Sequence, residues 1–364
     1  MEIVHADKAI KIPSKKIPEL LNDNVASAKA VKLKYVSDSD KGIERLKKGD
    51  KFEYRFDGKK VSDAETLDRI KKLVIPPAWE NVWICKYDNG HIQVTGIDAR
   101  GRKQYRYHPL WNALRNETKF YRLLEFGKCL PKIRERLQKD LSKQGLPKEK
   151  VLAAIVSIMD KTSIRIGNSF YEKLYGSFGL STMKDKHVKI EGGTIKFSFK
   201  GKKGVYHDIS MKSKKLANIV KQCRDIPGKE LFQYYDSDGE AHSIDSGEVN
   251  DYIKEISCGD FTSKDFRTWT GTVQCLMSLK DAGIFSNQKE MKKNIVSAID
   301  SVAESLGNTR TVCKKHYIHP TVLNSYENNK LERYLKDLEN KAAEGDEITA
   351  CEEIVLTLLQ KEAA

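Results

Sequence analysis

The spacing of apolar residues changes near His108-Pro109, and this change restricts the chain to a two-part fold. Before it, alternating segments such as Lys51–Phe56 run into turn dipeptides such as Asp57-Gly58, which is typical of β-hairpins. After it, apolar residues recur every three to four positions, as in amphipathic helices. We therefore predict an α+β fold, with a β-rich domain over 1–108 and a larger, mainly α-helical domain over 109–364.

Individual elements can be placed in both domains from the same patterns. In the first domain, a helix over 63–73 and a hairpin over 82–97 precede a short strand over 103–107. The helical domain is interrupted by turns at Gly192-Gly193 and Gly201–Gly204, which predict a small three-stranded sheet over 187–209. Pro131 and Pro147 are expected at helix starts. The predicted helices of this part cover 110–126, 132–144, 148–159 and 164–175.

Charge is unevenly distributed along the chain. The net charge is +14, but residues 321–364 hold 5 basic against 10 acidic side chains, so residues 1–320 carry +19. A basic body of this size favours a polyanionic partner, with nucleic acid the leading candidate. Plain solubilising charge is the alternative. The acidic tail is predicted to be helical and to pack on the second domain. Its apolar residues are Ile354, Leu356, Leu358 and Leu359.

Several classes of protein are disfavoured. Seven cysteines without a CxxC pair, and a polar start without a secretion signal, favour reduced thiols and a cytoplasmic location. The longest apolar run, Val151–Met159, is too short to cross a membrane. The sequence contains neither a GxxxxGK nor a GxGxxG motif, so nothing in it indicates a nucleotide-binding site. His316 and His319 lack further metal ligands at suitable spacing, so we expect neither a metal nor another cofactor.

Four dispersed motifs have the character of a phosphate-handling site. They are SIRIGNSFY (163–171), FKGKKG (199–204), KDFRTW (264–269) and LGNTRTVCKKHYIHP (306–320). Together with VIPPAWENVWI (74–84) and GIDARGRKQYRYHP (96–109), they make the chain resemble the type IB DNA topoisomerases, in particular their compact bacterial and poxvirus branch. The resemblance extends from about residue 74 to residue 320.

This resemblance implies a role for each of five residues. Tyr317 matches the nucleophile, Arg165 and Arg267 the two arginines that hold the scissile phosphate, and Lys202 the general acid. Asn308 takes the place of a histidine found in poxvirus and nuclear members, although a bacterial-type member can carry asparagine. An amide donates a hydrogen bond but carries no charge, so we expect a slower chemical step.

Each of these residues also has an ordinary interpretation when it is taken alone. An arginine on a predicted helix, like Arg165, is usually solvated or ion-paired, and a lysine-rich turn around Lys202 is usually solvated. An isolated tyrosine is most often a core or rim aromatic. The matching order of the motifs favours the site.

Candidate DNA contacts lie in both domains. Asn168 and Tyr171 follow Arg165 on the predicted helix, which the resemblance places in the major groove. A strip of aromatic and basic side chains near the end of the first domain is suited to backbone and groove contacts, unless one aromatic face of it packs in the core. The strip contains Arg102, Lys103, Tyr105, Arg106 and Tyr107.

The resemblance implies that the protein relaxes supercoiled DNA without ATP or metal, through transient cleavage of one strand and a 3′-phosphotyrosyl intermediate. The protein is then expected to be a monomer whose two domains clamp the duplex. A tyrosine recombinase and a non-enzymatic duplex-binding protein are the alternatives.

Overall fold

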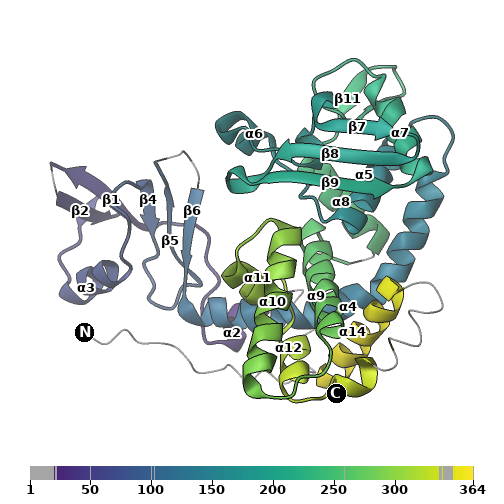
Figure 1. Ribbon diagram of the computed structural model, residues 1–364. Helices are drawn as coiled ribbons and strands as arrows, with labels where there is room; N and C mark the ends of the chain where they lie inside the picture. The colour runs from purple at the N-terminus through teal and green to yellow at the C-terminus, as the bar shows by residue number, and fades with distance from the viewer. Residues whose placement is uncertain are drawn as a thin grey trace. The chain divides into compact units, whose positions relative to one another are not determined.

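The computed structural model describes residues 20, 23–49, 51–99, 101, 103–257, 259–335, 338 and 347–363, without the side chains of 116, 117, 119, 120, 170 and 363. The chain divides into two compact units, Met1–Arg122 and Leu123–Ala364 (Figure 1). This division falls inside one long helix, so the boundary at 108/109 stays a prediction. Mixed β and α structure in unit 1 and largely helical structure in unit 2 confirm the α+β fold class.

Unit 1 is built on a six-stranded antiparallel sheet with the strand order β3-β2-β1-β4-β5-β6. The predicted hairpin at Asp57-Gly58 is confirmed, because both residues adopt positive φ (50° and 76°) between β2 and β3. Asp63 caps the predicted helix, whose Ile70 is buried against the sheet residues Ile84 and Val94. The elements of unit 1 are α2 (Asn24–Ala30), β1 (Ile43–Lys48), β2 (Lys51–Phe56), β3 (Lys59–Lys60), α3 (Ala64–Lys72), β4 (Glu80–Ile84), β5 (Ile92–Ile97), β6 (Lys103–Tyr107) and the start of α4 (Pro109–Leu141).

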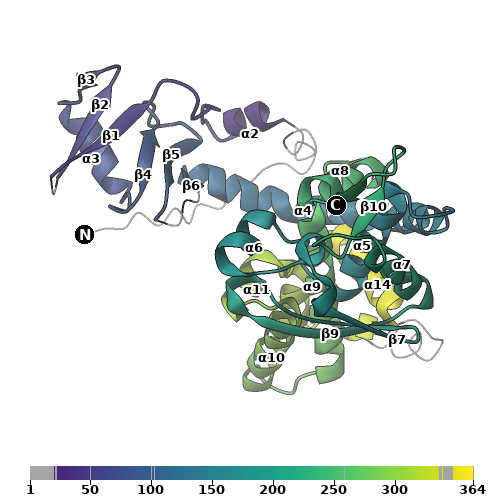
Figure 2. The same ribbon diagram turned by 90° about the horizontal axis from the view of Figure 1, so that it is seen from above.

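Unit 2 combines helices with the predicted three-stranded sheet, whose order is β7-β8-β9. Helix α5 is buried throughout its central part, residues 151–159, and contacts β9 as well as α7, α8 and α9 (Figures 1 and 2). The elements that follow α4 are α5 (Lys148–Thr162), α6 (Ser169–Tyr175), β7 (Val188–Glu191), β8 (Thr194–Lys200), β9 (Tyr206–Lys212), α7 (Lys214–Arg224), β10 (Gln233–Tyr235), β11 (Ala241–Ser243), α8 (Ser246–Ser257), α9 (Ser263–Ala282), α10 (Gln288–Leu306), α11 (Arg310–His316), α12 (Pro320–Glu327) and α14 (Glu347–Ala363).

One continuous helix, α4, replaces the two helices predicted over 110–126 and 132–144, and the placement of Pro131 at a helix start was wrong. A proline inside a helix removes one hydrogen bond and crowds the carbonyl four residues earlier. Burial of the apolar side chains on both sides of it outweighs this cost, because Leu130, Ile133 and Leu137 are all at most 2% exposed.

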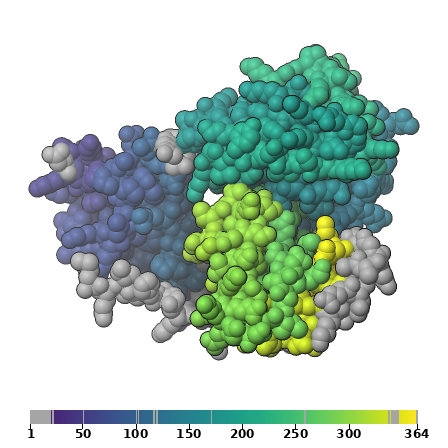
Figure 3. Space-filling model, in the orientation of Figure 1, coloured from purple at the N-terminus to yellow at the C-terminus, as the bar shows by residue number. Residues whose placement is uncertain are grey.

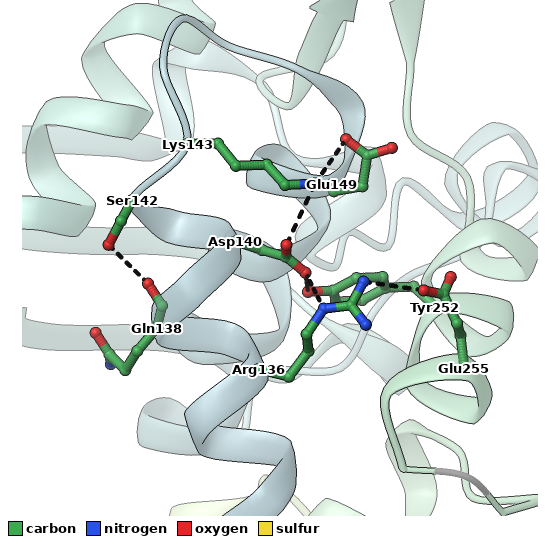
Figure 4. Close-up of polar contacts among 8 residues, drawn as sticks. All are labelled: Arg136, Gln138, Asp140, Ser142, Lys143, Glu149, Tyr252 and Glu255. Carbon is green, nitrogen blue, oxygen red and sulfur yellow. Dashed lines mark hydrogen bonds and ion pairs between the residues drawn. The ribbon is translucent and has the colours of Figure 1, made fainter.

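The end of α4 is fixed to α8 through the buried carboxylate of Asp140 (Figure 4). This carboxylate accepts from the Tyr252 hydroxyl at 2.8 Å and from Arg136 Nε at 2.9 Å, and it pairs with Lys143 Nζ at 3.3 Å. Burial alone raises the pKa of Asp140, but these donors outweigh burial and lower it. The group therefore stays ionised and bonded at neutral pH.

The described end of the acidic tail, α14, packs as a helix on unit 2, as predicted. Ile354, Leu358 and Leu359 of α14 are buried in the main core, and Leu356 is half-buried against it. Packing of the tail thus follows from an apolar stripe at helical spacing.

A polar network fastens the same helix to the rest of unit 2. The two carboxylate oxygens of Glu352 accept from Arg134 at 2.6 and 2.9 Å, and one of them also accepts from the indole N–H of Trp269 at 2.9 Å. Arg134 in turn donates to Asp160 of α5. The tail is therefore joined to α4 and α9 by one side chain.

Removal of this carboxylate is expected to destabilise the fold. Glu352→Ala leaves donors of Arg134 and Trp269 without acceptors in a partly buried place, so the free energy of unfolding should fall by about 2 kcal/mol. Urea denaturation measures the change. Gln360→Ala, at an exposed position of the same helix, is the control and should change stability by less than about 0.5 kcal/mol. Equal effects of the two substitutions would show that the network contributes nothing.

Candidate active site

The five predicted site residues come from five separate segments of unit 2. In the space-filling view, the surface around β8 and β9 (teal) lies beside the surface around α10 and α11 (lime) (Figure 3). Two direct contacts pair four of the residues, and the fifth shares a cavity with both arginines. The five residues are Arg165 between α5 and α6, Lys202 between β8 and β9, Arg267 in α9, Asn308 after α10 and Tyr317 after α11.

Arg267 is held almost completely buried in the first turns of α9. The helix begins with a reciprocal cap, in which the N–H of Thr262 donates to the carboxylate of Asp265 at 2.8 Å. Arg267 is 5% exposed, and it donates to the carbonyl oxygens of Ser163 and, at 2.9 Å, Leu306. Its Nε has no hydrogen-bond partner among the described residues. A guanidinium buried in this way is costly unless an anion supplies the missing charge.

Arg165 lies in a segment without regular secondary structure and not on the helix predicted over 164–175. Ser163 ends α5 with φ 56°, and α6 begins only at Ser169. Between these helices, Ile164 and Ile166 are buried on either side of the half-buried arginine. This alternation of burial has a period of two residues, as in a strand, and not the period of a helix.

The guanidinium of Arg165 meets the segment that follows α10. Its Nη2 donates to Oδ1 of Asn308 at 2.9 Å and approaches the carbonyl oxygen of Gly307 at 3.4 Å. Gly307 ends α10 with φ 57°, a conformation that glycine adopts without strain. The amide oxygen of Asn308 accepts from Arg165, and its amide nitrogen, which donates to the carbonyl oxygen of Leu306 at 3.4 Å, has a second N–H that can donate to a phosphate oxygen.

Tyr317 follows α11, and α9 holds its backbone. Its N–H donates to the carbonyl oxygen of Cys313 at 2.9 Å, and its own carbonyl oxygen accepts from the Thr272 hydroxyl at 3.4 Å. A Cβ atom on Gly271 would lie 2.7 Å from that same oxygen, so only glycine permits the approach. The phenol ring centroid lies 5.2 Å from Cζ of Arg267. Helix α9 therefore positions both the guanidinium and the phenol.

Lys202 lies in the turn between β8 and β9, as predicted. It lines a small cavity together with Arg165, His207 and Arg267, which we call the arginine cavity. The residue as a whole is exposed, but partial desolvation of its ammonium and the charges of Arg165, Lys203 and Arg267 lower the pKa of Lys202. His207 was missed in the sequence, where a histidine on a predicted strand carries no distinguishing signal.

The same positive charges act on the phenol. Burial on its own raises the pKa of Tyr317, but Arg267 and Arg165 outweigh it, so this pKa lies below its ordinary value near 10. Burial and the charge of Arg165 lower the pKa of Arg267 to about 10, which leaves its guanidinium charged at neutral pH. A cluster of cations around one phenol favours the phenolate.

Tyr105 and Tyr107 form an exposed aromatic pair on β6 in unit 1. Their ring centroids are 6.0 Å apart and the rings are nearly parallel, so the alternative of an aromatic face packed in the core is wrong for these two. Lys103 lies on the same face, with Nζ 5.6 Å from the Tyr105 ring centroid. Arg106 faces the other side of the strand and donates to a backbone carbonyl at 2.8 Å. Arg102 lies outside the described residues.

Asn168 and Tyr171 are both exposed at the start of α6. Asn168 precedes the helix, where its carbonyl oxygen accepts from the N–H of Glu172 at 3.1 Å. The ring of Tyr171 stacks on that of Tyr175, with centroids 6.1 Å apart. Both residues therefore remain candidate contacts.

His319, one of the two histidines that flank Tyr317, caps a helix. His319 is buried, and its Nδ1 accepts from the N–H of Thr321 at the start of α12, which is a capping role. The part of the chain that the structure describes contains no cluster of three or more His, Cys, Asp or Glu side chains able to hold a metal ion. None of its helices is both long and apolar enough to span a membrane.

Two family models match the chain. Residues 108–343 match the catalytic core of eukaryotic DNA topoisomerase I, and residues 51–98 match the N-terminal domain of bacterial DNA topoisomerase IB. The first match contains all five site residues. The second covers most of the six-stranded sheet of unit 1.

Curated relatives agree with these models. DNA topoisomerase 1B of Acanthamoeba polyphaga mimivirus is 35% identical over 296 residues, which is 79% of this chain and 88% of the relative. DNA topoisomerase 1B of vaccinia virus (strain Copenhagen) is 26% identical over 230 residues, which is 63% of this chain and 70% of the relative. The chain therefore belongs to the type IB DNA topoisomerases.

Proposed function

We propose that this protein relaxes supercoiled duplex DNA by cutting one strand through Tyr317 and resealing it. The observation that carries the proposal is the convergence of the phenol of Tyr317 with the buried guanidinium of Arg267, beside the Arg165–Asn308 pair. Membership of the type IB family supports the same activity. It does not favour the recombinase or the non-enzymatic alternative.

The reaction consists of two exchanges of one phosphate ester for another. In the first, the phenolate oxygen of Tyr317 forms a bond to the scissile phosphorus, and the bond from phosphorus to the 5′ oxygen breaks. The phenol proton passes to solvent, and Lys202 gives a proton to the departing oxygen. After the cut strand has turned, the 5′ hydroxyl attacks the phosphotyrosine and reverses each transfer. Because bond energy is conserved, the proposed cycle requires neither ATP nor a metal.

The two arginines stabilise the charge that grows on the phosphate oxygens in the transition state. Donors that are already fixed in place are worth most, since they need no reorganisation during the reaction. Arg267 is fixed by two backbone carbonyls and Arg165 by Asn308. The amide of Asn308 adds a neutral donor, so its contribution is smaller than that of a charged imidazole.

The partner in this proposal is double-stranded DNA, which a monomer clamps between its two domains. The proposed domains are 1–108 and 109–364, the latter including the tail 321–364, and the start of the catalytic-core match at residue 108 supports this boundary. The proposed compartment is the cytoplasm. The DNA contacts that we propose are Arg102, Lys103, Tyr105, Arg106, Tyr107, Asn168 and Tyr171.

A plasmid assay tests the proposal. Purified protein with supercoiled plasmid, EDTA and no nucleotide should yield relaxed topoisomers, and peptide mapping of a trapped adduct should find DNA on Tyr317. A recombinase would leave most plasmid untouched without its own sites. An architectural protein would retard DNA on a gel and leave its linking number unchanged after protein removal. Either outcome would overturn the proposal.

The pH dependence of cleavage should respond to Arg165. Cleavage needs Tyr317 deprotonated and Lys202 protonated, so the rate is a bell-shaped function of pH. Arg165 lowers the pKa of both groups, and Arg165→Ala should therefore raise both and move the whole bell to higher pH.

Single-turnover cleavage across the pH range measures this shift. Arg165→Lys is the matched control, because it loses the fork of the guanidinium but keeps the charge. Its bell should be lower than that of the wild type but should stay near the same pH. A pH–rate profile of Arg165→Ala that is lower than that of the wild type but not displaced along the pH axis would contradict the assignment of the acidic limb to Tyr317 and of the alkaline limb to Lys202.

A further inference from the structure

His207 lies between two of the segments that carry site residues. It sits on β9 opposite Phe199 of β8, and the two rings stack with centroids 5.1 Å apart and planes inclined by 22°. The stacked ring is half-buried and lines the arginine cavity. The imidazole is therefore held from the sheet side by an aromatic neighbour.

Two glycines contact this ring from different parts of the chain. A Cβ atom on Gly201 would lie 2.6 Å from Cδ2 of His207, and one on Gly307 would lie 2.4 Å from Cε1. Neither distance is possible for a real side chain, so the ring occupies the space that a side chain at either glycine would need. The two glycines are 106 positions apart in the sequence, and the imidazole lies against both of them.

The residue that follows each glycine belongs to the proposed active site. Gly201 immediately precedes Lys202, and Gly307 immediately precedes Asn308. The carbonyl oxygen of Gly307 also receives the 3.4 Å approach of Arg165. Any displacement of the ring therefore changes the packing against Gly201 and Gly307, whose backbones determine the positions of Lys202 and Asn308.

We propose that His207 is a positioning residue that fixes the turn carrying Lys202 against the segment carrying Asn308, so that the ammonium of Lys202 can reach the leaving 5′ oxygen. This inference rests on the proposed function, in which Lys202 is the general acid. Burial and the charges of Arg165 and Arg267 lower the pKa of His207, so a neutral ring fills the position without adding a further positive charge to the cavity.

The test uses DNA in which sulfur replaces the bridging 5′ oxygen at the scissile phosphate. A thiolate leaves without being protonated, so this substrate does not need a general acid. Lys202→Ala should cleave ordinary DNA about 100-fold or more slowly than the wild type and should recover most of the loss on the sulfur substrate. His207→Ala should show the same pattern with a smaller loss, on the order of 10-fold on ordinary DNA.

His242→Ala is the matched control for loss of a stacked cross-strand histidine. His242 pairs with Tyr234 across the β10–β11 sheet in the same unit, with ring centroids 5.7 Å apart, and it does not line the arginine cavity. Its cleavage of both substrates should match that of the wild type. Thermal unfolding of each variant separates loss of positioning from loss of fold.

A second variant tests the contact from the other side. Gly201 has φ −91°, so alanine is compatible with its backbone, and the added Cβ meets only the imidazole within 3 Å. Gly201→Ala should slow cleavage of ordinary DNA by displacing the ring. In the double variant with His207→Ala the clash is absent, so the two effects should not add. The Gly201→Ala variant tests the proposal even if His207→Ala fails to fold, because the cleavage rate of Gly201→Ala alone should still recover on the sulfur substrate.

The outcomes separate this proposal from the one on which it rests. If Lys202→Ala does not recover on the sulfur substrate, the general acid is misassigned and the proposal for His207 falls with it, whereas relaxation through Tyr317 is judged separately by the plasmid assay. If Lys202→Ala recovers but His207→Ala is equally slow on both substrates, only the role of His207 is overturned. Additive effects of the two substitutions in the double variant would also overturn it.

Discussion

Replacement of Tyr317 by phenylalanine is expected to abolish both plasmid relaxation and the covalent adduct, while DNA binding is retained. Only the oxygen is lost, because phenylalanine keeps the ring against Arg267 and the backbone contacts with α9. The residual cleavage rate should be lower than that of the wild type by at least about 10⁴-fold, as for other removed nucleophiles. Relaxation by the variant at the wild-type rate would rule out Tyr317.

Tyr326→Phe provides a matched control for this experiment. Tyr326 lies on α12, and its hydroxyl donates to the carbonyl oxygen of Gly283 at 2.7 Å and accepts from Asn294 at 2.8 Å. Loss of this buried hydroxyl should lower the free energy of unfolding by about 1 kcal/mol without reducing the cleavage rate. Loss of the Tyr317 hydroxyl should instead reduce the cleavage rate without lowering the free energy of unfolding. The pair distinguishes a catalytic hydroxyl from a structural one.

Local patterns in the sequence were sufficient for much of the fold. The hairpin at Asp57-Gly58 depends on two residues that accept positive φ, and the three-stranded sheet depends on glycine turns. The packing of the tail followed from an apolar stripe that includes Leu358 and Leu359. In each of these cases the determinant lies within a few residues of the element that it specifies.

Features that depend on distant contacts were not predicted. The helix α4 continues past Pro131 because its flanking leucines and isoleucines are buried in unit 2, which local propensity does not reveal. Arg165 was placed on a helix because the helical pattern after Ser169 was extended too far back, although Ile164 and Ile166 already alternate. The exposure of Tyr105 likewise depends on which face of the sheet is covered.

The candidate site shows the same limit. The motifs named its five residues, and the resemblance supplied their roles, which remain proposals. The contacts between the segments were not predictable from the motifs, since Arg267 reaches Ser163 and Leu306 across 104 and 39 positions. His207 could not be recognised for the same reason, because its significance lies in its contact with Gly307, which is 100 positions away.

Arg267→Ala is expected to reduce both cleavage and stability, and the two losses have separate causes. The free energy of unfolding should fall by about 2 kcal/mol, because the carbonyl oxygens of Ser163 and Leu306 lose the hydrogen bonds that Arg267 donates. Cleavage should slow by about 10²- to 10³-fold, because a pre-aimed donor to the phosphate is lost. The pKa of Tyr317 should also rise, since Arg267 is the strongest charge that lowers it.

Arg224→Ala separates these two effects. Arg224 of α7 also donates to a backbone carbonyl, that of Val188 at 2.7 Å, and pairs with Asp185, but it does not line the arginine cavity. Its removal should cost stability of a similar order, about 1 kcal/mol, and leave cleavage unchanged below the unfolding temperature. Single-turnover cleavage and urea denaturation of both variants therefore test the assignment. If the cleavage rate falls equally in both, the loss in Arg267→Ala reflects weakened folding, and a direct role of this guanidinium at the phosphate is excluded.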